Sequence, residues 1–243
     1  MNIKFIIEYD GSNYKGWQIQ KNHHSIQKEL KNAFAKVLPK EEINIVGSGR
    51  TDSGVHAIGQ VASLKLNNSP NLDSLFKSVN SIINNDIYIK SYSEVENKFH
   101  ARHAAVSRKY KYYLSNEYSV IKKNFLWFIE FNSLDKKQLM ECAQIIIGEH
   151  DFSSFSASKQ ETKNKRCIIY ESFWEESKNE LIYTVKANRF LHHMVRFLVG
   201  TMVQTSRGKM KINDFRQLLD NTSNYSPLCA PAQGLFLNEV FYD

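Results

Sequence analysis

A glycine-rich stretch near the start of the chain carries residues that could do acid–base chemistry. It reads Gly47-Ser-Gly-Arg-Thr-Asp-Ser-Gly-Val-His-Ala57 and lies between two β-rich runs, residues 43–46 and 60–66. Its glycines favour a sharp loop at the end of a strand, because glycine tolerates positive φ. Such a loop would present Asp52 on a rigid frame, and the guanidinium of Arg50 could keep that carboxylate ionised.

The same stretch admits simpler interpretations. Asp52 could cap the backbone of an ordinary polar turn. The stretch is not a P-loop, because a P-loop ends in Gly-Lys-Ser/Thr and this one ends in Gly-Arg-Thr-Asp. Asp52 and His56 as metal ligands would need further ligands, and none is nearby in the sequence. We therefore expect the loop to position one acid, Asp52, and at most one base, His56, without a metal.

Composition narrows the class of protein. The chain has 243 residues, of which 42% are hydrophobic and 12% aromatic, enough for one large or two modest folded domains. No apolar run is long enough to span a membrane, and the first residues enter a strand pattern without a signal peptide. The three cysteines are odd in number and widely spaced, which favours reduced thiols and a cytoplasmic protein. A net charge of +7 is compatible with a nucleic-acid partner without establishing one.

Hydrophobic periodicity predicts the order of the elements. In the first half, the order β-α-β-β-α-β is that of the ferredoxin-like motif. Strands are expected over residues 2–9, 43–46, 60–66 and 87–95, with helices over 26–38, capped by Ser25, and 72–83.

The pattern then begins again and predicts a second, larger half. Strands are expected over residues 106–114, 125–131, 166–175, 180–187 and 235–242, helices over 134–147, 189–204 and 212–220, and a mobile polar loop over 153–165. We expect an α+β protein with two ferredoxin-like or RRM-like halves, residues 1–98 with the Asp52 loop and residues 99–243. Because no linker separates them, we expect one continuous, mixed but mainly antiparallel sheet with a catalytic cleft across it.

The expected helix over residues 189–204 carries charge on a largely apolar surface. Two of its stripes are apolar, and the third contains Arg189, His193 and Arg196. A buried arginine needs an anion, because an unpaired buried charge is strongly destabilising. Arg196 could pair with Asp52 across the cleft, or this face could meet phosphate. The arginines could equally reach solvent or pair with structural acids.

A third segment interleaves aromatic and basic residues. It reads Phe99-His-Ala-Arg-His-Ala-Ala-Val-Ser-Arg-Lys-Tyr-Lys-Tyr-Tyr113. Such a pattern can stack bases while it neutralises backbone phosphates, which makes Tyr110 or Tyr112 a candidate for base contact. Alternating tyrosines on a strand also simply pack a sheet.

Together these segments resemble the bacterial tRNA pseudouridine synthase A family. The matching pieces are Gly49-Arg-Thr-Asp-Ser-Gly-Val-His-Ala57, Phe99-His-Ala-Arg102 with Arg108-Lys-Tyr-Lys-Tyr112, His150-Asp-Phe-Ser-Ser-Phe155, Phe190-Leu-His-His-Met-Val-Arg196 with Val199-Gly200, and Ala230-Pro-Ala-Gln-Gly-Leu235. They occur in the family's order and cover nearly the whole length. One departure is Phe197, where the family often has an asparagine; it bears on local packing and not on the reaction.

The resemblance implies a role for each matching residue. Asp52 corresponds to the catalytic aspartate, and Arg50 to the arginine that helps to extrude the target base. Tyr110 corresponds to the tyrosine that stacks on the flipped uracil. Arg196 corresponds to the basic residue that holds the carboxylate, and Leu235 to an apolar residue lining the base pocket. The resemblance further implies a homodimer, without cofactor or metal, that isomerises uridines at about positions 38 to 40 of the tRNA anticodon stem-loop.

The chemistry fits these residues on its own terms. Pseudouridine formation breaks the C1′–N1 bond and joins C5 to C1′; it consumes nothing, and no redox or phosphate-transfer motif is found in the sequence. One carboxylate could attack the ribose or the uracil, or stabilise a cationic sugar. A paired uridine must first leave its stack, at about a few kcal/mol. Further candidate contacts to RNA are Lys15, Arg108, Arg166, Arg189 and His193.

Two other functions remain open. The chain could be an RNA-binding module of the same fold without chemistry, which turnover on RNA would exclude. It could instead be a small-molecule hydrolase that uses Asp52 with His56 as acid and base, which a lack of RNA affinity would favour. That second alternative leaves the basic, aromatic strand unexplained.

Overall fold

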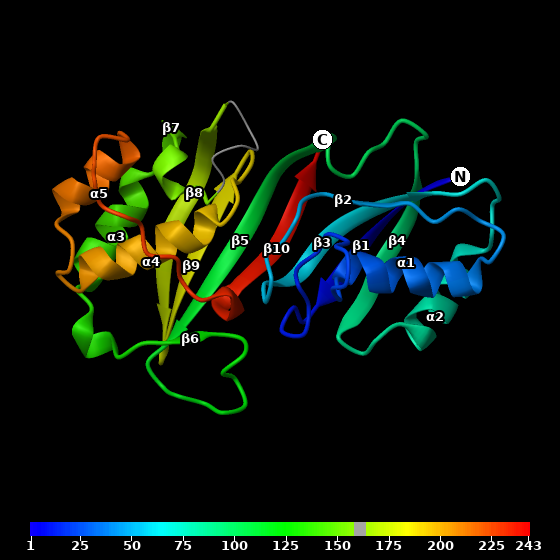
Figure 1. Ribbon diagram of the computed structural model, residues 1–243, viewed down its shortest axis with the longest axis horizontal. Coiled ribbons are helices and arrows are strands. Elements are labelled where there is room, and N and C mark those ends of the chain that lie inside the picture. The colour runs from blue at the N-terminus through cyan, green and yellow to red at the C-terminus, as the bar shows by residue number, and fades with distance from the viewer. Residues whose placement is uncertain (158–163) are drawn as a thin grey trace. The chain divides into compact units, whose positions relative to one another are not determined.

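The protein is α+β, as predicted, and its chain forms two compact units. The computed structural model describes residues 1–157 and 164–243 (Figure 1). The first unit comprises Met1–Val106 with Phe236–Asp243, and the second comprises Ser107–Leu235. Within the described ranges, no helix combines the length and the apolar character needed to cross a membrane.

The first unit has the predicted β-α-β-β-α-β order. Its elements are β1 (Asn2–Tyr9), α1 (Ile26–Val37), β2 (Ile45–Gly47), β3 (His56–Lys65), α2 (Leu72–Ile82) and β4 (Ile87–Val95). β1 pairs antiparallel with both β3 and β4. The free edge of β3 is shared by two partners: β2 pairs antiparallel with its far end, and β10 (Leu235–Tyr242) pairs parallel with its first residues. The strand β10 therefore completes the sheet beside the beginning of β3.

A cluster of phenylalanines forms the core of the first unit. The ring of Phe5 on β1 lies 5.6 Å from that of Phe34 on α1 and 5.7 Å from that of Phe76 on α2, and all three are buried. Because one strand residue contacts both helices, α1 and α2 cover the same face of the sheet (Figure 1). The buried residues of α1 recur at the helical spacing that predicted it.

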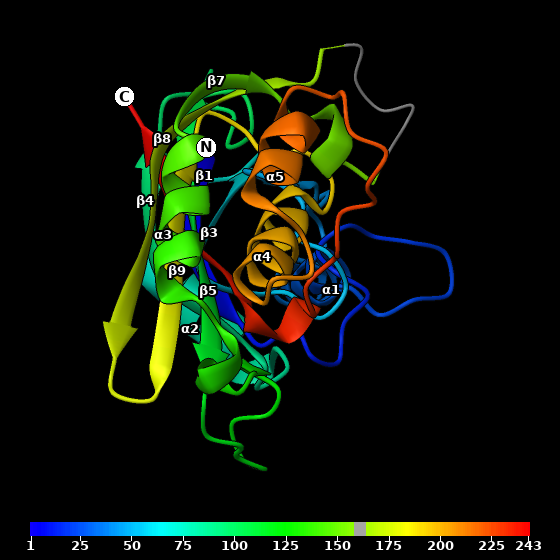
Figure 2. The same cartoon turned by 90° about the vertical axis from the view of Figure 1, so that its left-hand side faces the viewer.

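The second unit is also a sheet covered by helices. Its elements are β5 (Ala105–Ser115), β6 (Trp127–Phe128), α3 (Lys136–Ile145), β7 (Gly148–Asp151), β8 (Arg166–Ser177), β9 (Glu180–Ala187), α4 (Met194–Ser206) and α5 (Ile212–Leu219). The strand order is β5-β9-β8-β7 with antiparallel neighbours, and β6 adds a short parallel pairing to β5. The helix α3 packs on β8, α4 and α5 (Figure 2). As its two apolar stripes predicted, α4 is largely buried.

The structure corrects three local predictions in this unit. The expected strand over residues 125–131 is reduced to β6 and a short 3₁₀ turn. Strand β7 was missed, because its sequence Gly-Glu-His-Asp is polar throughout. The helix expected from Arg189 begins at Met194, because His193 has a left-handed φ of 62°. Of the loop expected over residues 153–165, residues 158–163 lie outside the described residues.

Candidate active site

The Asp52 loop joins β2 to β3 in the first unit. Within it Thr51 is buried, Asp52 is half-buried and Arg50 is exposed. The hydroxyl of Thr51 forms a hydrogen bond of 2.8 Å with that of Tyr9 on β1. The inward anchoring of Thr51 fixes the backbone on which its two neighbours are presented.

A buried polar network holds the loop from beneath. The Gln60 side chain on β3 is fully buried; its Nε2 donates to the carbonyl of Gly49 at 3.1 Å, and its Oε1 accepts from the hydroxyl of Ser48 at 2.7 Å. Burial raises the pKa of Tyr9, so its hydroxyl stays neutral within this network. Since unpaired buried polar groups are costly, these bonds give the loop one favoured conformation.

The segment over residues 14–17, before α1, is hydrogen-bonded to one side of the loop. The amide of Trp17 donates to the carbonyl of Thr51 at 3.1 Å, and the amide of Gly54 donates to the carbonyl of Tyr14 at 3.3 Å. Gly16 has a φ of +87°, and a Cβ there would collide with the Thr51 carbonyl. A glycine is therefore required where the two segments meet.

Arg50 lies on the solvent-exposed side of the Asp52 loop. Its Nε donates to Oε1 of Gln18 at 3.1 Å, and its side chain is exposed. Lys15, two residues before Trp17, is exposed as well. Arg50 thus lies on the Asp52 loop itself, and Lys15 lies on the segment that is hydrogen-bonded to this loop.

The structure places His56 where it cannot serve as a base. It begins β3 and is 1% exposed, and its ring stacks on Phe236 with centroids 4.6 Å apart. Its Nδ1 lies 3.0 Å from the amide nitrogen of Gly11 and 3.1 Å from Oδ1 of Asp10. The amide of Gly11 donates to Nδ1, and the Asp10 carboxylate lies against the same nitrogen. His56 is a buried support of the Asp10–Gly11 turn.

In the second unit, Tyr110 and Tyr112 lie on one face of β5 but differ in burial. Tyr112 is fully buried, and its hydroxyl donates to the carbonyl of Pro231 at 2.8 Å. Burial raises the pKa of Tyr112 well above its usual value. Tyr110 is 9% exposed and meets the ring of Phe190 edge-on at 5.0 Å. Tyr112 is thus a structural residue, whereas Tyr110 keeps a small exposed fraction.

Arg196 on α4 is hydrogen-bonded to the segment over residues 228–235. Its Nε donates to the carbonyl of Ala230 at 2.7 Å, and the amide of Ala230 donates back to the carbonyl of Arg196 at 3.0 Å. One turn further along α4, a Cβ on Gly200 would collide with the Leu228 carbonyl. The absence of a side chain at Gly200 is what lets this segment approach the helix closely enough for both bonds.

The same segment ends at Leu235. This residue is 4% exposed and follows a short 3₁₀ turn over Ala232–Gly234. A Cβ on Gly234 would lie 2.6 Å from the ring of Tyr112. Leu235 is therefore positioned by a glycine packed on a buried tyrosine.

Asn188 forms hydrogen bonds with two other candidate RNA contacts, Arg108 and Arg189. Its carbonyl accepts from Nη1 of Arg108 at 3.0 Å, and its Oδ1 accepts the amide of Arg189 at 2.8 Å. The Arg189 guanidinium also donates to the carbonyl of Asn164 at 3.2 Å. These contacts hold both arginines against backbone carbonyls. Sequence reasoning overlooked Asn188, whose only signal is a polar residue at the end of an apolar strand.

The remaining candidates differ in their surroundings. Arg166 is exposed and forms an ion pair with Glu149, with 2.7 Å between Nε and Oε1. His193 is half-buried at the start of α4, and its ring lies 4.0 Å from that of His192. The pairing of Arg166 weakens its case as an RNA contact, since Glu149 already neutralises it.

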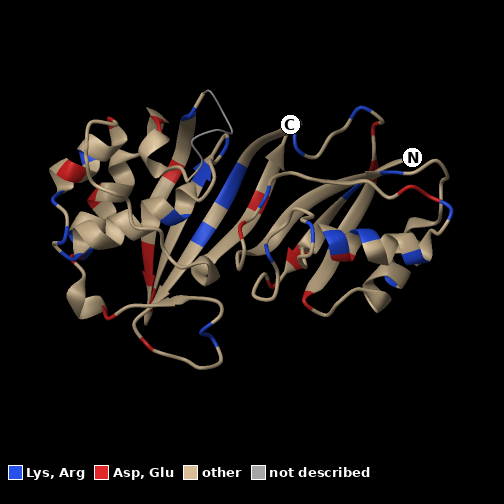
Figure 3. Ribbon diagram, viewed as in Figure 1, with Lys and Arg blue, Asp and Glu red and all other residues tan. Residues whose placement is uncertain are grey.

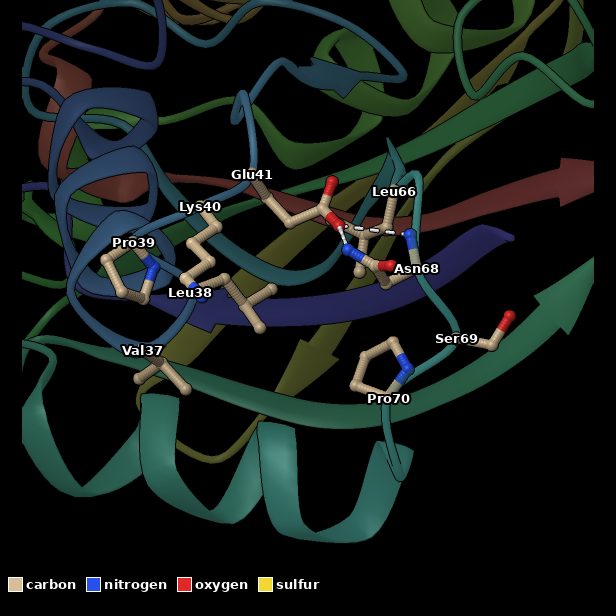
Figure 4. Close-up of a pocket in the computed structure, with 9 residues that line it drawn as sticks. All are labelled: Val37, Leu38, Pro39, Lys40, Glu41, Leu66, Asn68, Ser69 and Pro70. Carbon is tan, nitrogen blue, oxygen red and sulfur yellow. Dashed lines mark hydrogen bonds between the residues drawn. The ribbon is translucent and has the colours of Figure 1, made fainter.

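A cavity of about 380 Å³ lies at the opposite end of the β2–β3 hairpin from the Asp52 loop (Figure 4). Glu41 precedes β2 and Leu66 follows β3, and both line it. The Glu41 carboxylate accepts the amides of Asn67 at 2.9 Å and Asn68 at 3.0 Å. These bonds lower the pKa of Glu41. The cavity is not part of the candidate active site.

Comparison with known proteins gives the family. The chain matches the family described as "tRNA pseudouridine synthase" over residues 5–103 and 142–243. It is 36% identical to the tRNA pseudouridine synthase A of Thermoanaerobacter sp. (strain X514), with 99% of each chain covered. It is 37% identical to that of Pelodictyon phaeoclathratiforme, with 99% of each covered, and 36% identical to that of Bacillus pumilus, with 100% of each covered. The chain belongs to the tRNA pseudouridine synthase family and is an isomerase, as the sequence motifs predicted.

Proposed function

We propose that this isomerase converts uridine to pseudouridine at about positions 38 to 40 of the tRNA anticodon stem-loop, with Asp52 as the catalytic carboxylate. The observation that carries the proposal is the setting of Asp52. It is a half-buried acid on a loop that Gln60, Tyr9 and Thr51 fix from beneath, with the exposed Arg50 beside it. A catalytic group held by its supports before substrate arrives loses little orientation during the reaction.

The reaction requires one group that can stabilise positive charge and accept a proton. The C1′–N1 bond of the uridine breaks, the uracil turns, and C5 bonds to C1′. The proton on C5 leaves and N1 gains one, so atoms and charge balance without a further reactant. The Asp52 carboxylate is suited to stabilise the sugar, either covalently or as a counter-ion, and to assist loss of the C5 proton.

The other residues take roles around the reacting base. Arg50 would fill the space that the extruded base leaves in the stem, at the exposed side of the loop. Tyr110 would stack on the base with the face of its ring, and Leu235 would line the apolar side of the pocket. Arg196 would hold the Asp52 carboxylate ionised. Each role rests on the family resemblance together with the burial and contacts of that residue.

We also propose a cytoplasmic homodimer. The dimer rests on the family resemblance, and sedimentation equilibrium would measure it. The location rests on the tRNA substrate and on the thiols: burial raises the pKa of Cys142 to about 12 and that of Cys167 to about 11. No disulfide joins the cysteines, all of which are within the described residues. Free cysteines fit a reducing compartment.

Tritium release from an unmodified tRNA transcript labelled at uracil C5 tests the proposal. We expect the wild type to release tritium, and Asp52→Ala and the near-isosteric Asp52→Asn to release none while they bind the transcript as tightly as the wild type. Replacing the uridines at positions 38 to 40 by cytidine should remove the release. Turnover by Asp52→Asn would contradict the catalytic role, and undiminished release from the cytidine transcript would contradict the site.

A further inference from the structure

The exposed face of α1 carries positive charge only. With about 100° of rotation per residue, Lys28, Lys31 and Lys36 fall within an arc of roughly 140°. This arc is centred opposite the buried stripe of Ile26, Leu30, Ala33 and Phe34. We call these three lysines the α1 lysine face; Figure 3 shows the basic bands along the helix. The one acid of α1, Glu29, lies at the edge of the arc, 3.6 Å from His24.

Within the described part of the chain, no carboxylate neutralises this face. Among the residues that the structure describes, none lies within 4.0 Å of the ammonium groups of Lys28, Lys31 or Lys36. The sheet of the second unit differs, because Lys109 and Lys186 lie 3.1 and 3.7 Å from the two carboxylate oxygens of Glu171. The α1 lysine face thus keeps its charge available for an external anion.

Backbone hydrogen bonds connect α1 directly to the Asp52 loop. The amides of Ile26 and Gln27, in the first turn, donate to the carbonyls of Gly16 and Trp17 at 3.2 and 3.0 Å. The amide of Trp17 in turn donates to Thr51 in the loop. The helix has 12 residues and is therefore about 18 Å long. Its lysines form a row that begins at the loop and extends away from it.

We propose that the α1 lysine face binds the phosphate backbone of the tRNA substrate next to the reacting nucleotide. The proposal rests on the proposed role of Asp52, which places the target uridine at the loop. A row of unpaired ammonium groups fits a chain of regularly spaced phosphates, and such contacts set register and affinity without reading sequence. These lysines are positioning residues: they hold the stem while Asp52 reacts, so they should contribute to KM and not to kcat.

The salt dependence of tRNA binding tests the proposal. The test variant combines Lys28→Gln, Lys31→Gln and Lys36→Gln. Loss of three phosphate contacts should lower the slope of log affinity against log salt concentration by about 2 to 3. In turnover assays at moderate salt, KM should rise about ten-fold while kcat at saturating tRNA stays unchanged. An unchanged slope would overturn the proposal, as would a fall in kcat with KM unchanged.

A second triple variant controls for net charge. Lys77→Gln, Lys123→Gln and Lys178→Gln remove the same charge from α2 and from two loops of the second unit. We expect this variant to change the slope by less than one; an equal loss in both variants would mean that only net charge matters and would overturn the proposal. Thermal melts check that both variants fold. Because the slopes report binding, they can be read even if Asp52→Ala keeps turnover and the catalytic assignment falls.

Discussion

The Asp52 loop and the segment over residues 228–235 are both irregular stretches of chain held in place, but by different means. Buried polar side chains hold the loop, chiefly Gln60 and Thr51. Close backbone approach holds the segment, at Gly200 and Gly234. The difference follows from what each presents. A loop that carries a charged side chain outward is fixed by hydrogen bonds on its inner side, whereas a segment that buries Leu235 is fixed by packing.

If close backbone approach is what lets the segment dock, Gly200→Ala should have the largest effect on stability. The added Cβ would collide with the Leu228 carbonyl and strain the bonds between Arg196 and Ala230. We expect a loss of about 3 kcal/mol or more in the free energy of unfolding, measured by denaturant titration. The matched control is Gly49→Ala, where a Cβ meets no atom within 4 Å. A Gly200→Ala protein as stable as this control would show that packing is not what holds the segment.

If hydrogen bonds hold the Asp52 loop, Gln60→Leu should displace it. The substitution preserves volume but leaves the Gly49 carbonyl and the Ser48 hydroxyl without their partner. We expect a loss of about 1–3 kcal/mol, together with a fall in kcat larger than any rise in KM. Ser48→Ala removes only one of these bonds and should cost about 1 kcal/mol. A normal kcat in Gln60→Leu would show that the hydrogen bonds of Gln60 are not what holds the Asp52 loop.

The two tyrosines of β5 sharpen the comparison within one unit. Tyr112→Phe removes the hydrogen bond to the Pro231 carbonyl and should destabilise the protein by about 1 kcal/mol. Tyr110→Phe keeps the ring that packs on Phe190 and should unfold at the same denaturant concentration as the wild type. Equal midpoints for the two variants would show that the Tyr112 hydroxyl does not hold the segment.

A substitution at Glu41 should have the smallest effect on stability. Its surface carboxylate holds a third irregular stretch, at Asn67 and Asn68 after β3. Hydrogen bonds from the Asn67 and Asn68 amides lower its pKa below 4.5 in the folded protein. A carboxyl whose pKa falls on folding adds stability above its unfolded pKa, and loses it as the pH falls through the folded value. Glu41→Gln should therefore melt below the wild type at pH 7 and converge with it as the pH falls through the folded-state pKa of Glu41. A constant difference between the two melting temperatures would exclude this linkage.

Local patterns in the sequence predicted most of the elements, because periodic burial is a local property. They failed at the start of α4, because helical spacing continues back to Arg189 in the sequence. In the structure the Arg189 amide donates to Asn188, and the left-handed φ of His193 delays the helix to Met194. Motif spacing also predicted the Asp52 loop as a candidate site. It could not reveal Gln60 as a support, because that role depends on contacts across the sheet. Nor could it separate Tyr110 from Tyr112, since both lie on one face and only burial distinguishes them.

The place of β10 in the sheet has a consequence for how the protein is made. Its residues Phe236 and Leu237 pair with His56 and Ala57 at the start of β3, directly after the Asp52 loop. During synthesis this strand leaves the ribosome only after the whole of the second unit. The beginning of β3, next to the Asp52 loop, therefore gains its parallel partner only after residues 107–235 have been synthesised. Completion of the sheet in the first unit is thus coupled to synthesis of the second unit, which lies between β3 and β10 in the sequence.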